Sequence, residues 1–176
     1  TAEAWDWPRL RAMLTQVLGG LAHAHARGIV HRDIKPTNIL TFPGDPPRYK
    51  LCDFGIASSI DAPADAASWG SPNYMAPEQI RGDWRAQGPW TDLYALGCTA
   101  WRLAAGRMPY PEDGDVILAK LRGPPLHFEA VGAPRGLADW LHRLVHPISR
   151  SRFPTAADAA MALANLPLTA ALRTTR

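Results

Sequence analysis

The stretch 31–40 reads His-Arg-Asp-Ile-Lys-Pro-Thr-Asn-Ile-Leu and carries the most structural information in this chain. Three polar groups, Asp33, Lys35 and Asn38, fall close together around a proline, so the composition predicts a loop. A further carboxylate follows in Asp-Phe-Gly at 53–55. Taken alone, an Asp and a Lys two residues apart are more often a solvated, internally paired loop, so the flanking sequence has to show whether these side chains carry a function.

The residues on both sides of this loop predict its structural setting. Apolar residues recur at helical spacing over 8–27, which predicts a helix with one buried face, and Ile29-Val30 resembles a short strand. Two more strand-like stretches are 39–40 and 49–52, and the Pro- and Gly-containing segment 41–48 between them is typical of a turn. We therefore expect 39–40 and 49–52 to pair as a small β-hairpin.

Most of the remaining chain favours helices. Residues 91–105 are apolar nearly all round, which indicates a buried helix. Thr91 or Asp92 can cap its beginning, and Gly106 can end it. The stretch 53–77 is long, rich in small residues and aperiodic, which favours a functional loop. Further helices are expected at about 113–122, 135–145 and 155–165. The pattern predicts a mainly α fold, a helical bundle with one small hairpin and one long loop.

Composition and charge exclude several classes of protein. Nineteen Lys and Arg against 16 Asp and Glu give a net charge of +3, too small and too scattered to indicate a nucleic-acid partner. No apolar stretch approaches the ~18 residues needed to cross a bilayer, so no membrane segment is expected in this chain. Cys52 and Cys98 are too few for a disulfide scaffold or a four-cysteine zinc site. A reducing, cytoplasmic setting is therefore expected.

Three motifs in this order and spacing resemble those of the protein kinase family. The stretch 31–40 is similar to the catalytic loop, 53–55 to the metal-binding motif, and Ala-Pro-Glu at 76–78 to the end of the substrate loop. Each motif alone is a weak signal, but the ordered set and its surroundings extend over about residues 8–165. The resemblance implies the fold of the large, C-terminal lobe, with the long loop as the activation loop. It also implies ATP and Mg²⁺ as cofactors and a protein as substrate.

The resemblance implies a role for each functional side chain of the first two motifs. Asp33 would accept or orient the proton of the substrate hydroxyl, and Lys35 would meet the oxygens of the transferring phosphoryl group. Asn38 and Asp53 would hold Mg²⁺ through their oxygens. Leu40 resembles the residue that lies under the adenine ring, although its side chain also suits ordinary core packing.

Other positions resemble structural residues of the family. His31 is interpreted as a packing residue that stacks on Phe54 rather than as a base. Cys52 is interpreted as a small core residue beside the metal motif, with a reactive thiol as the alternative. Asp92 resembles the aspartate that hydrogen-bonds to the catalytic-loop backbone, and an ordinary helix cap would use the same geometry.

Glu78 resembles the carboxylate of a buried ion pair with an arginine late in the family's sequence. Arg152 is the best match for that arginine. The spacing after Pro147 is longer than usual, so Arg150 stays an alternative. An exposed carboxylate at the start of a helix is the other interpretation of Glu78.

Lys35 and the segment 70–78 indicate the serine/threonine class within the family. Ser71 is expected to bridge Asp33 and Lys35, and the residues after it to hold the substrate residue that follows the phosphoacceptor. The long loop contains no Thr before Pro77, and Ser68 is the only near candidate for a phosphorylated loop residue.

The chain also departs from the family pattern. It contains no Gly-x-Gly-x-x-Gly turn, no Val-Ala-Ile-Lys-like strand and no helix upstream of 8–27 to supply a glutamate partner. We therefore expect a partial kinase domain over 1–165 that consists of the C-terminal lobe without the N-terminal lobe, followed by a tail over 166–176. We also expect this piece to be inactive by itself.

The implied function is a bacterial serine/threonine protein kinase that transfers the γ-phosphoryl group of ATP to protein hydroxyls. The alternative is a non-catalytic, pseudokinase-like interaction module made of the same lobe. A small-molecule kinase of related fold is disfavoured by the segment 70–78. The sequence leaves the substrate protein and the oligomeric state open.

Overall fold

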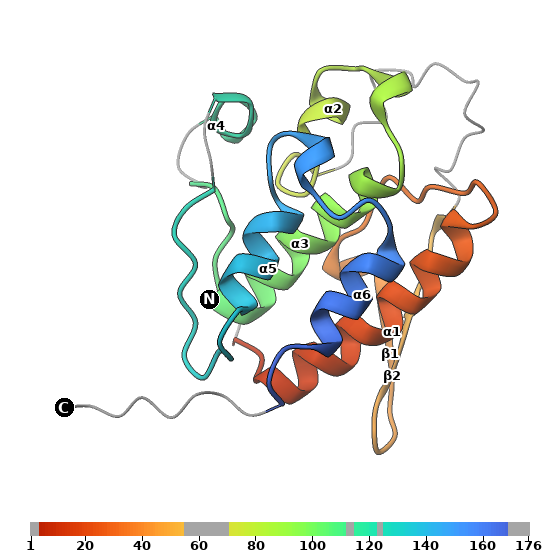
Figure 1. Ribbon diagram of the computed structural model, residues 1–176, viewed down its shortest axis with the longest axis vertical. Helices are drawn as coiled ribbons and strands as arrows, with labels where there is room; N and C mark the ends of the chain where they lie inside the picture. Colours follow the sequence, from red (N-terminus) through yellow and green to blue (C-terminus); the bar gives the residue numbers. More distant parts are fainter. Residues whose placement is uncertain (1–3, 55–70, 112–114, 123–124, 169–176) are drawn as a thin grey trace.

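The structure, a computed structural model, describes residues 4–54, 71–111, 115–122 and 125–168 (Figure 1). Its elements are α1 (Trp7–His25), η1 (Pro36–Asn38), β1 (Ile39–Phe42), β2 (Arg48–Leu51), α2 (Pro77–Ile80), η4 (Trp84–Ala86), α3 (Pro89–Ala105), α4 (Val116–Arg122), α5 (Leu137–Leu144), η5 (Ser149–Ser151) and α6 (Ala156–Ala164), where η marks a short 3-10 helix. Figure 1 shows α3 running through the middle of the molecule, with α5 along one side and α1 and α6 along the other. The predicted mainly helical fold with one small hairpin is confirmed.

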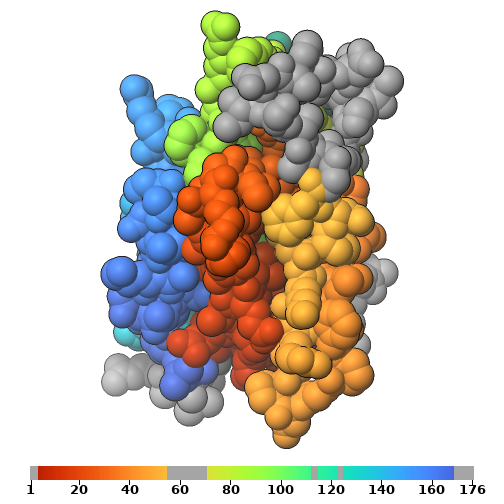
Figure 2. Space-filling model, turned by 90° about the vertical axis from the view of Figure 1, so that its right-hand side faces the viewer, coloured from red at the N-terminus to blue at the C-terminus, as the bar shows by residue number. Residues whose placement is uncertain are grey.

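Helix α1 presents one apolar face to the core, as its spacing predicted. Its buried residues are Trp7, Leu10, Met13, Leu14, Val17, Leu18, Leu21 and Ala24. Asp6 caps the helix by accepting a hydrogen bond from the backbone N–H of Arg9 at 2.9 Å. Figure 2 shows α1 between the hairpin and α6 on one face of the molecule.

The expected strand at Ile29-Val30 is wrong. The backbone N–H of Ile29 donates to the carbonyl oxygen of Ala24 at 3.1 Å and so completes the end of α1. Among the described residues, the only sheet pairs β1 with β2, so this extended piece has no neighbour with which to form a ladder. An isolated two-residue stretch without such a partner is not a strand.

The predicted hairpin forms, with a shorter turn than the expected 41–48. The paired residues are Ile39–Leu51, Leu40–Lys50, Thr41–Tyr49 and Phe42–Arg48, in antiparallel register. Thr41 and Phe42 continue β1, because β-branched and aromatic side chains suit a pleated strand. On α1, the side-chain oxygen of Gln16 accepts the backbone N–H of Tyr49 at 2.9 Å and fastens the hairpin to the helix.

Helix α3 is the buried centre of the fold, and every residue from Thr91 to Trp101 is buried. It begins two residues earlier than expected, since Gly88 is the N-cap and Pro89 occupies the first turn. The expected cap at Thr91 or Asp92 is therefore wrong. Thr91 lies inside the helix and its hydroxyl accepts the N–H of Gly88 at 3.0 Å. The left-handed residue that ends the helix is Gly106, as predicted (φ 70°).

The three later helices, α4, α5 and α6, are confirmed within a few residues of their predicted bounds. Thr155 caps α6 by accepting the backbone N–H of Asp158 at 3.1 Å. Residues 55–70, most of the predicted long loop, lie outside the described residues, as does Ser68. Within the described part of the chain, none of the helices combines the length and the apolar character that a membrane crossing requires.

Candidate active site

The loop at residues 31–38, called the catalytic loop here for its resemblance to that motif, is held in place by Asp92 on α3. The two carboxylate oxygens of Asp92 accept the backbone N–H groups of His31 (2.8 Å) and Arg32 (2.7 Å). The ring nitrogen Nε2 of His25 on α1 lies 2.8 Å from the same carboxylate. Asp92 is fully buried, so its charge is compensated by these hydrogen bonds and not by water. The predicted contact between Asp92 and the loop backbone is confirmed.

Two residues of the site adopt the left-handed backbone conformation that non-glycine residues rarely adopt. They are Arg32 (φ 67°) and Asp53 (φ 60°). Such conformations cost on the order of 1–3 kcal/mol and persist only where the surroundings hold them. At Arg32 the hold is visible, because the amide of Gln79 donates to the Arg32 carbonyl at 2.9 Å and accepts the N–H of Ala76 at 3.0 Å. Gln79 thereby ties the catalytic loop to α2.

His31 is a buried packing residue. Its Nδ1 lies 3.2 Å from the backbone N–H of Asp33 and can only accept there, which leaves the ring proton on Nε2. Nε2 then donates to the carbonyl oxygen of Cys52 at 2.7 Å. The ring also packs on Phe54, with 4.6 Å between the ring centroids. The predicted contact with Phe54 is confirmed, although the rings are tilted by 55° and not stacked, and both ring nitrogens are engaged by the backbone.

The structure brings three of the predicted site residues together. Lys35 Nζ donates to Asp33 Oδ2 at 2.7 Å. The amide nitrogen of Asn38 donates to the same oxygen at 3.1 Å and to the Asp33 carbonyl oxygen at 2.8 Å. Oδ1 of Asp33 makes no hydrogen bond within the described part of the chain. The expected bridge through Ser71 does not form in that part of the chain either, and Lys35 contacts Asp33 directly.

Asp53 is joined to this group through the backbone. The N–H of Cys52 donates to the Asn38 carbonyl oxygen at 2.9 Å, which places Asp53 next to the catalytic loop. The Cys52 thiol lies 3.4 Å from that carbonyl oxygen and 3.7 Å from the Asp53 carboxylate. Partial burial and the Asp53 charge both raise the pKa of the Cys52 thiol, so it stays protonated and is not an activated nucleophile.

The donor set fits a magnesium–nucleotide complex better than a metal site built by the protein alone. Across the described residues, no group of three or more His, Cys, Asp or Glu side chains could hold a metal ion. Asn38 makes its hydrogen bonds with its nitrogen, so its oxygen is available, and the Asp53 carboxylate is exposed. Mg²⁺ is commonly held by one or two such protein ligands together with phosphate oxygens.

Leu40, the predicted residue under adenine, lies on β1 with 45% of its surface exposed. It is therefore not an ordinary core residue. Its contact with a nucleotide stays a prediction.

The predicted ion pair between Glu78 and Arg152 is present and buried. Arg152 donates from Nη1 to Oε1 at 2.7 Å and from Nη2 to Oε2 at 3.0 Å, a bidentate pair. The hydroxyl of Thr91 donates to Oε1 at 2.9 Å. The other donors of Arg152 reach the backbone carbonyl oxygens of Trp90, His146 and Pro147. Arg150, the alternative partner, is exposed on η5.

Two residues of this region were not predicted from the sequence. Gln79 follows the Ala-Pro-Glu motif without any pattern of its own. Lys120 on α4 is buried and donates to the backbone carbonyl oxygens of residues just before α2, which are Pro72, Asn73 and Met75. A lysine in an amphipathic helix usually indicates an exposed face, so the sequence contained no signal for this contact.

The amino-acid sequence of this chain is similar to those of several curated proteins. The chain is 46% identical over 126 residues to the serine/threonine-protein kinase Pkn1 of Myxococcus xanthus. The aligned region covers 65% of this chain and 18% of Pkn1. It is 40% identical over 114 residues to the serine/threonine-protein kinase PknL of Mycobacterium tuberculosis. That aligned region covers 63% of this chain and 28% of PknL. The chain thus spans less than a third of the length of either curated relative.

Solved structures agree with the fold. A crystal structure of the Rad53 kinase domain and SCD2 in complex with AMPPNP superposes with a TM-score of 0.73 at 27% identity, over 94% of this chain and 63% of that one. A crystal structure of Rad53 1-466 with AMP-PNP gives a TM-score of 0.70 at 25% identity, over 89% of this chain and 40% of that one. The family model described as protein kinase domain matches residues 3–129, more than half of the chain. The chain therefore belongs to the protein kinase family.

Proposed function

We propose that this chain carries the catalytic groups of a serine/threonine protein kinase, which transfers the γ-phosphoryl group of ATP to Ser and Thr hydroxyls of protein substrates. The observation that carries the proposal is the joining of Asp33, Lys35 and Asn38 around one carboxylate oxygen. Phosphoryl transfer depends on positioning and on charge neutralisation. The buried Asp92 holds the loop in position, and Lys35 places a positive charge beside Asp33.

Asp33 is the residue that handles the substrate proton. Its Oδ2 is occupied by Lys35 and Asn38, which orients the carboxylate and leaves Oδ1 for an incoming hydroxyl. As the hydroxyl oxygen bonds to phosphorus, its proton moves to or toward Asp33. The Lys35 side chain is 27% exposed, so its ammonium group can move between Asp33 and the oxygens of the transferring phosphoryl group.

Asn38 and Asp53 are proposed to bind Mg²⁺, and Leu40 is proposed to lie under the adenine ring. Bound Mg²⁺–ATP would supply the electrophilic phosphorus and the ADP leaving group. The two Rad53 structures were solved with AMP-PNP, a nucleotide, which supports nucleotide binding in this fold. The exposed Asp53 carboxylate and the free oxygen of Asn38 are the atoms suited to the cation.

The serine/threonine class is supported by Lys35 and by the names of the relatives, both of which are serine/threonine-protein kinases. We further propose that residues 1–165 form one domain followed by a tail at 166–176, since α6 packs on α1. The use of ATP and the two free cysteines support a cytoplasmic setting.

The test is a phosphotransfer assay on the complete protein encoded by the gene, with Mg²⁺, labelled ATP and a generic protein substrate. The wild-type protein should transfer the label from ATP to Ser or Thr residues of the protein substrate. Asp33→Asn should lower kcat by roughly 10²–10⁴-fold and leave the KM for ATP nearly unchanged, since general-base contributions are of that order. Asp53→Asn should instead raise the KM for Mg²⁺–ATP, because it removes a charged ligand of the metal.

Interchangeable defects in the two variants would overturn these role assignments. Label on Tyr alone would overturn the serine/threonine class. If wild-type protein transfers no more phosphate than Asp33→Asn, the non-catalytic interaction module is the better description.

A further inference from the structure

Lys120 is the one fully buried lysine among the described residues, and it lies on a short helix at the edge of the fold. Lysine is almost never fully buried unless it is paired. No described carboxylate lies within ion-pair distance of it, so something other than a salt bridge holds this side chain in place.

The ammonium group of Lys120 uses all three of its donors on one piece of backbone. Nζ donates to the carbonyl oxygens of Pro72 (2.9 Å), Asn73 (2.8 Å) and Met75 (2.8 Å). An ammonium has three N–H groups, so none is left for solvent. Three converging carbonyl oxygens at such short distances are the partners of a charged lysine, since a neutral amine has only two N–H groups to give.

Two aromatic rings line the same site. Nζ lies 5.2 Å from the ring centroid of Tyr94 and 5.8 Å from that of Tyr110, both within the range of cation–π attraction. Burial lowers the pKa of Lys120, and the carbonyl oxygens and ring faces act against that by favouring the cation.

The segment that Lys120 holds, residues 71–76, lies between the catalytic loop and α2. Gln79 accepts the N–H of Ala76 and donates to the carbonyl oxygen of Arg32, so the end of this segment is adjacent to the catalytic loop. Just beyond it, Glu78 is held by Arg152, whose guanidinium lies 4.7 Å from the ring centroid of Tyr94. Two buried cations beside one tyrosine of α3 therefore hold this part of the chain: Lys120 binds the backbone of residues 72–75, and Arg152 binds the side chain of Glu78.

We propose that Lys120 is a positioning residue for substrate recognition: it holds the backbone of residues 72–75 in the shape that receives a protein substrate beside Asp33. This inference rests on the proposed kinase function. Its physical basis is that residues 72–75 turn three carbonyl oxygens inward, and without the ammonium those oxygens would be buried without donors and the segment would rearrange to reach water.

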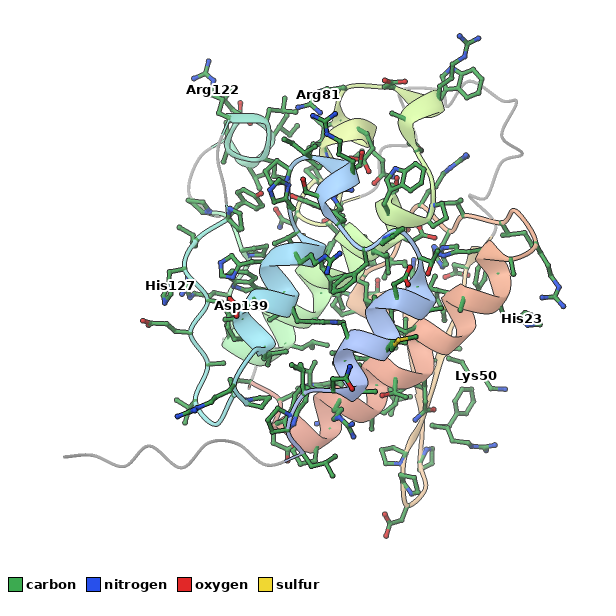
Figure 3. All side chains as sticks on the ribbon, viewed as in Figure 1. His23, Lys50, Arg81, Arg122, His127 and Asp139 are labelled. Atoms are coloured by element: carbon green, nitrogen blue, oxygen red, sulfur yellow. The ribbon has the colours of Figure 1, made fainter. Side chains whose placement is uncertain are left out.

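The first measurement compares Lys120→Met with Arg122→Met in steady-state kinetics of the complete protein, using a peptide substrate that the wild type phosphorylates. Methionine keeps most of the apolar stem and removes the three donors. Arg122 is exposed on the same helix and points away from the molecule in Figure 3, so its variant is the matched control. Lys120→Met should raise the KM for the peptide about tenfold or more, given the strength of charged hydrogen bonds. The KM for ATP should change less than about twofold, and Arg122→Met should change neither value.

The second measurement is amide hydrogen exchange, which needs no activity. Lys120→Met should exchange faster at 73–76 while α1 and α3 keep their protection. Equal loss of protection in α1 and α3, or parallel changes in both KM values, would overturn the positioning role. Should Lys120→Met fail to fold, Lys120→Gln keeps two N–H donors and is required to show the same selective exchange.

The two measurements also separate this inference from the kinase proposal. If Lys120→Met shows selective exchange at 73–76 but the wild-type protein transfers no phosphate, the kinase proposal and the substrate role are both overturned. Lys120 then remains a residue that holds the segment in place without a role in catalysis. Normal phosphotransfer with an unchanged peptide KM in Lys120→Met overturns only the inference.

Discussion

Two ion pairs of this protein have the same shortest distance, 2.7 Å, but opposite surroundings. Lys35 and Asp33 join through one hydrogen bond, and their side chains are 27% and 10% exposed. Arg152 and Glu78 join through two, and their side chains are 0% and 6% exposed. The first pair is on the catalytic loop, and the second joins the first turn of α2 to the end of η5.

The difference shows that burial and hydrogen-bond partners decide whether a charged side chain can change its contacts. In the buried pair all five donors of Arg152 are used, and neither charge can change partner without leaving a buried group unsatisfied. In the loop pair, Asp33 keeps one oxygen without a described partner and the Lys35 side chain is partly exposed. We therefore expect the buried pair to govern stability and the loop pair to govern chemistry.

The largest expected effect is on stability at the buried pair. Arg152→Ala or Glu78→Ala should each lower the free energy of unfolding by ~3–5 kcal/mol, because each leaves a buried charge without its partner. The double variant should cost much less than the sum of the single costs. Chemical denaturation of the four proteins measures this cycle.

Two controls complete the cycle. Arg150→Ala, on the exposed η5, should stay within about 0.5 kcal/mol of wild type. Asp33→Asn should change stability by less than ~1 kcal/mol, since it affects a pair that is partly exposed. A large stability loss in Asp33→Asn would contradict the division of tasks between the two pairs.

Packing around α3 gives a second, smaller contrast, between Gly97 on α3 and Gly20 on α1. A Cβ on Gly97 would lie 2.7 Å from Cβ of Leu144 and 2.8 Å from Cγ1 of Val145, so Gly97→Ala should cost ~1–3 kcal/mol by overpacking α3 against α5. A Cβ on Gly20 meets nothing within 4 Å. Gly20→Ala should therefore stabilise the protein by roughly 0.5–1 kcal/mol through helix propensity. Thermal unfolding of both variants measures the contrast, and stability changes of the same sign in both variants would contradict it.

The last expected effect is absent at neutral pH: it is the response of the buried region to alkaline pH. Burial raises the pKa of Tyr110 to about 12 and that of Tyr94 well above its ordinary value. The unfolded chain releases these protons near pH 10, so above that pH the folded state binds more protons and stability falls as pH rises. For Tyr110 the loss should be about 1 kcal/mol between pH 10 and 11.

Phenolate absorbance during an alkaline titration tests this prediction. Tyr110→Phe should titrate one tyrosine fewer and lose less stability over the same pH range. Full ionisation of all tyrosines near pH 10 in folded protein would contradict the burial of this region.

Several features were predictable from the sequence because they depend on neighbours in the chain. The apolar face of α1 follows from helical periodicity, and the buried character of α3 from its nearly continuous apolar composition. The grouping of Asp33, Lys35 and Asn38 follows from a turn of a few residues between them. The choice of Arg152 over Arg150 was only a preference until the structure showed which guanidinium is buried.

Other features depended on contacts between distant parts of the chain. Lys120 and its three carbonyl partners are 45 to 48 residues apart, and no periodicity or propensity relates them. Gln79 reaches back 47 residues to Arg32. Helix α3 begins at Pro89 with Gly88 as its N-cap, and Asp92, which local rules allow as a cap, instead accepts two backbone N–H groups of the catalytic loop.

The sequence by itself determined the family, the order of the elements and the chemical groups of the site, since these depend on residue type and local spacing. Only the tertiary structure decided which charges are buried and which backbone groups they satisfy. The physical reason is that the cost of burying a charge depends on every donor and acceptor that packing brings around it, and those partners come from α1, α3, α4 and the segment before α2 together.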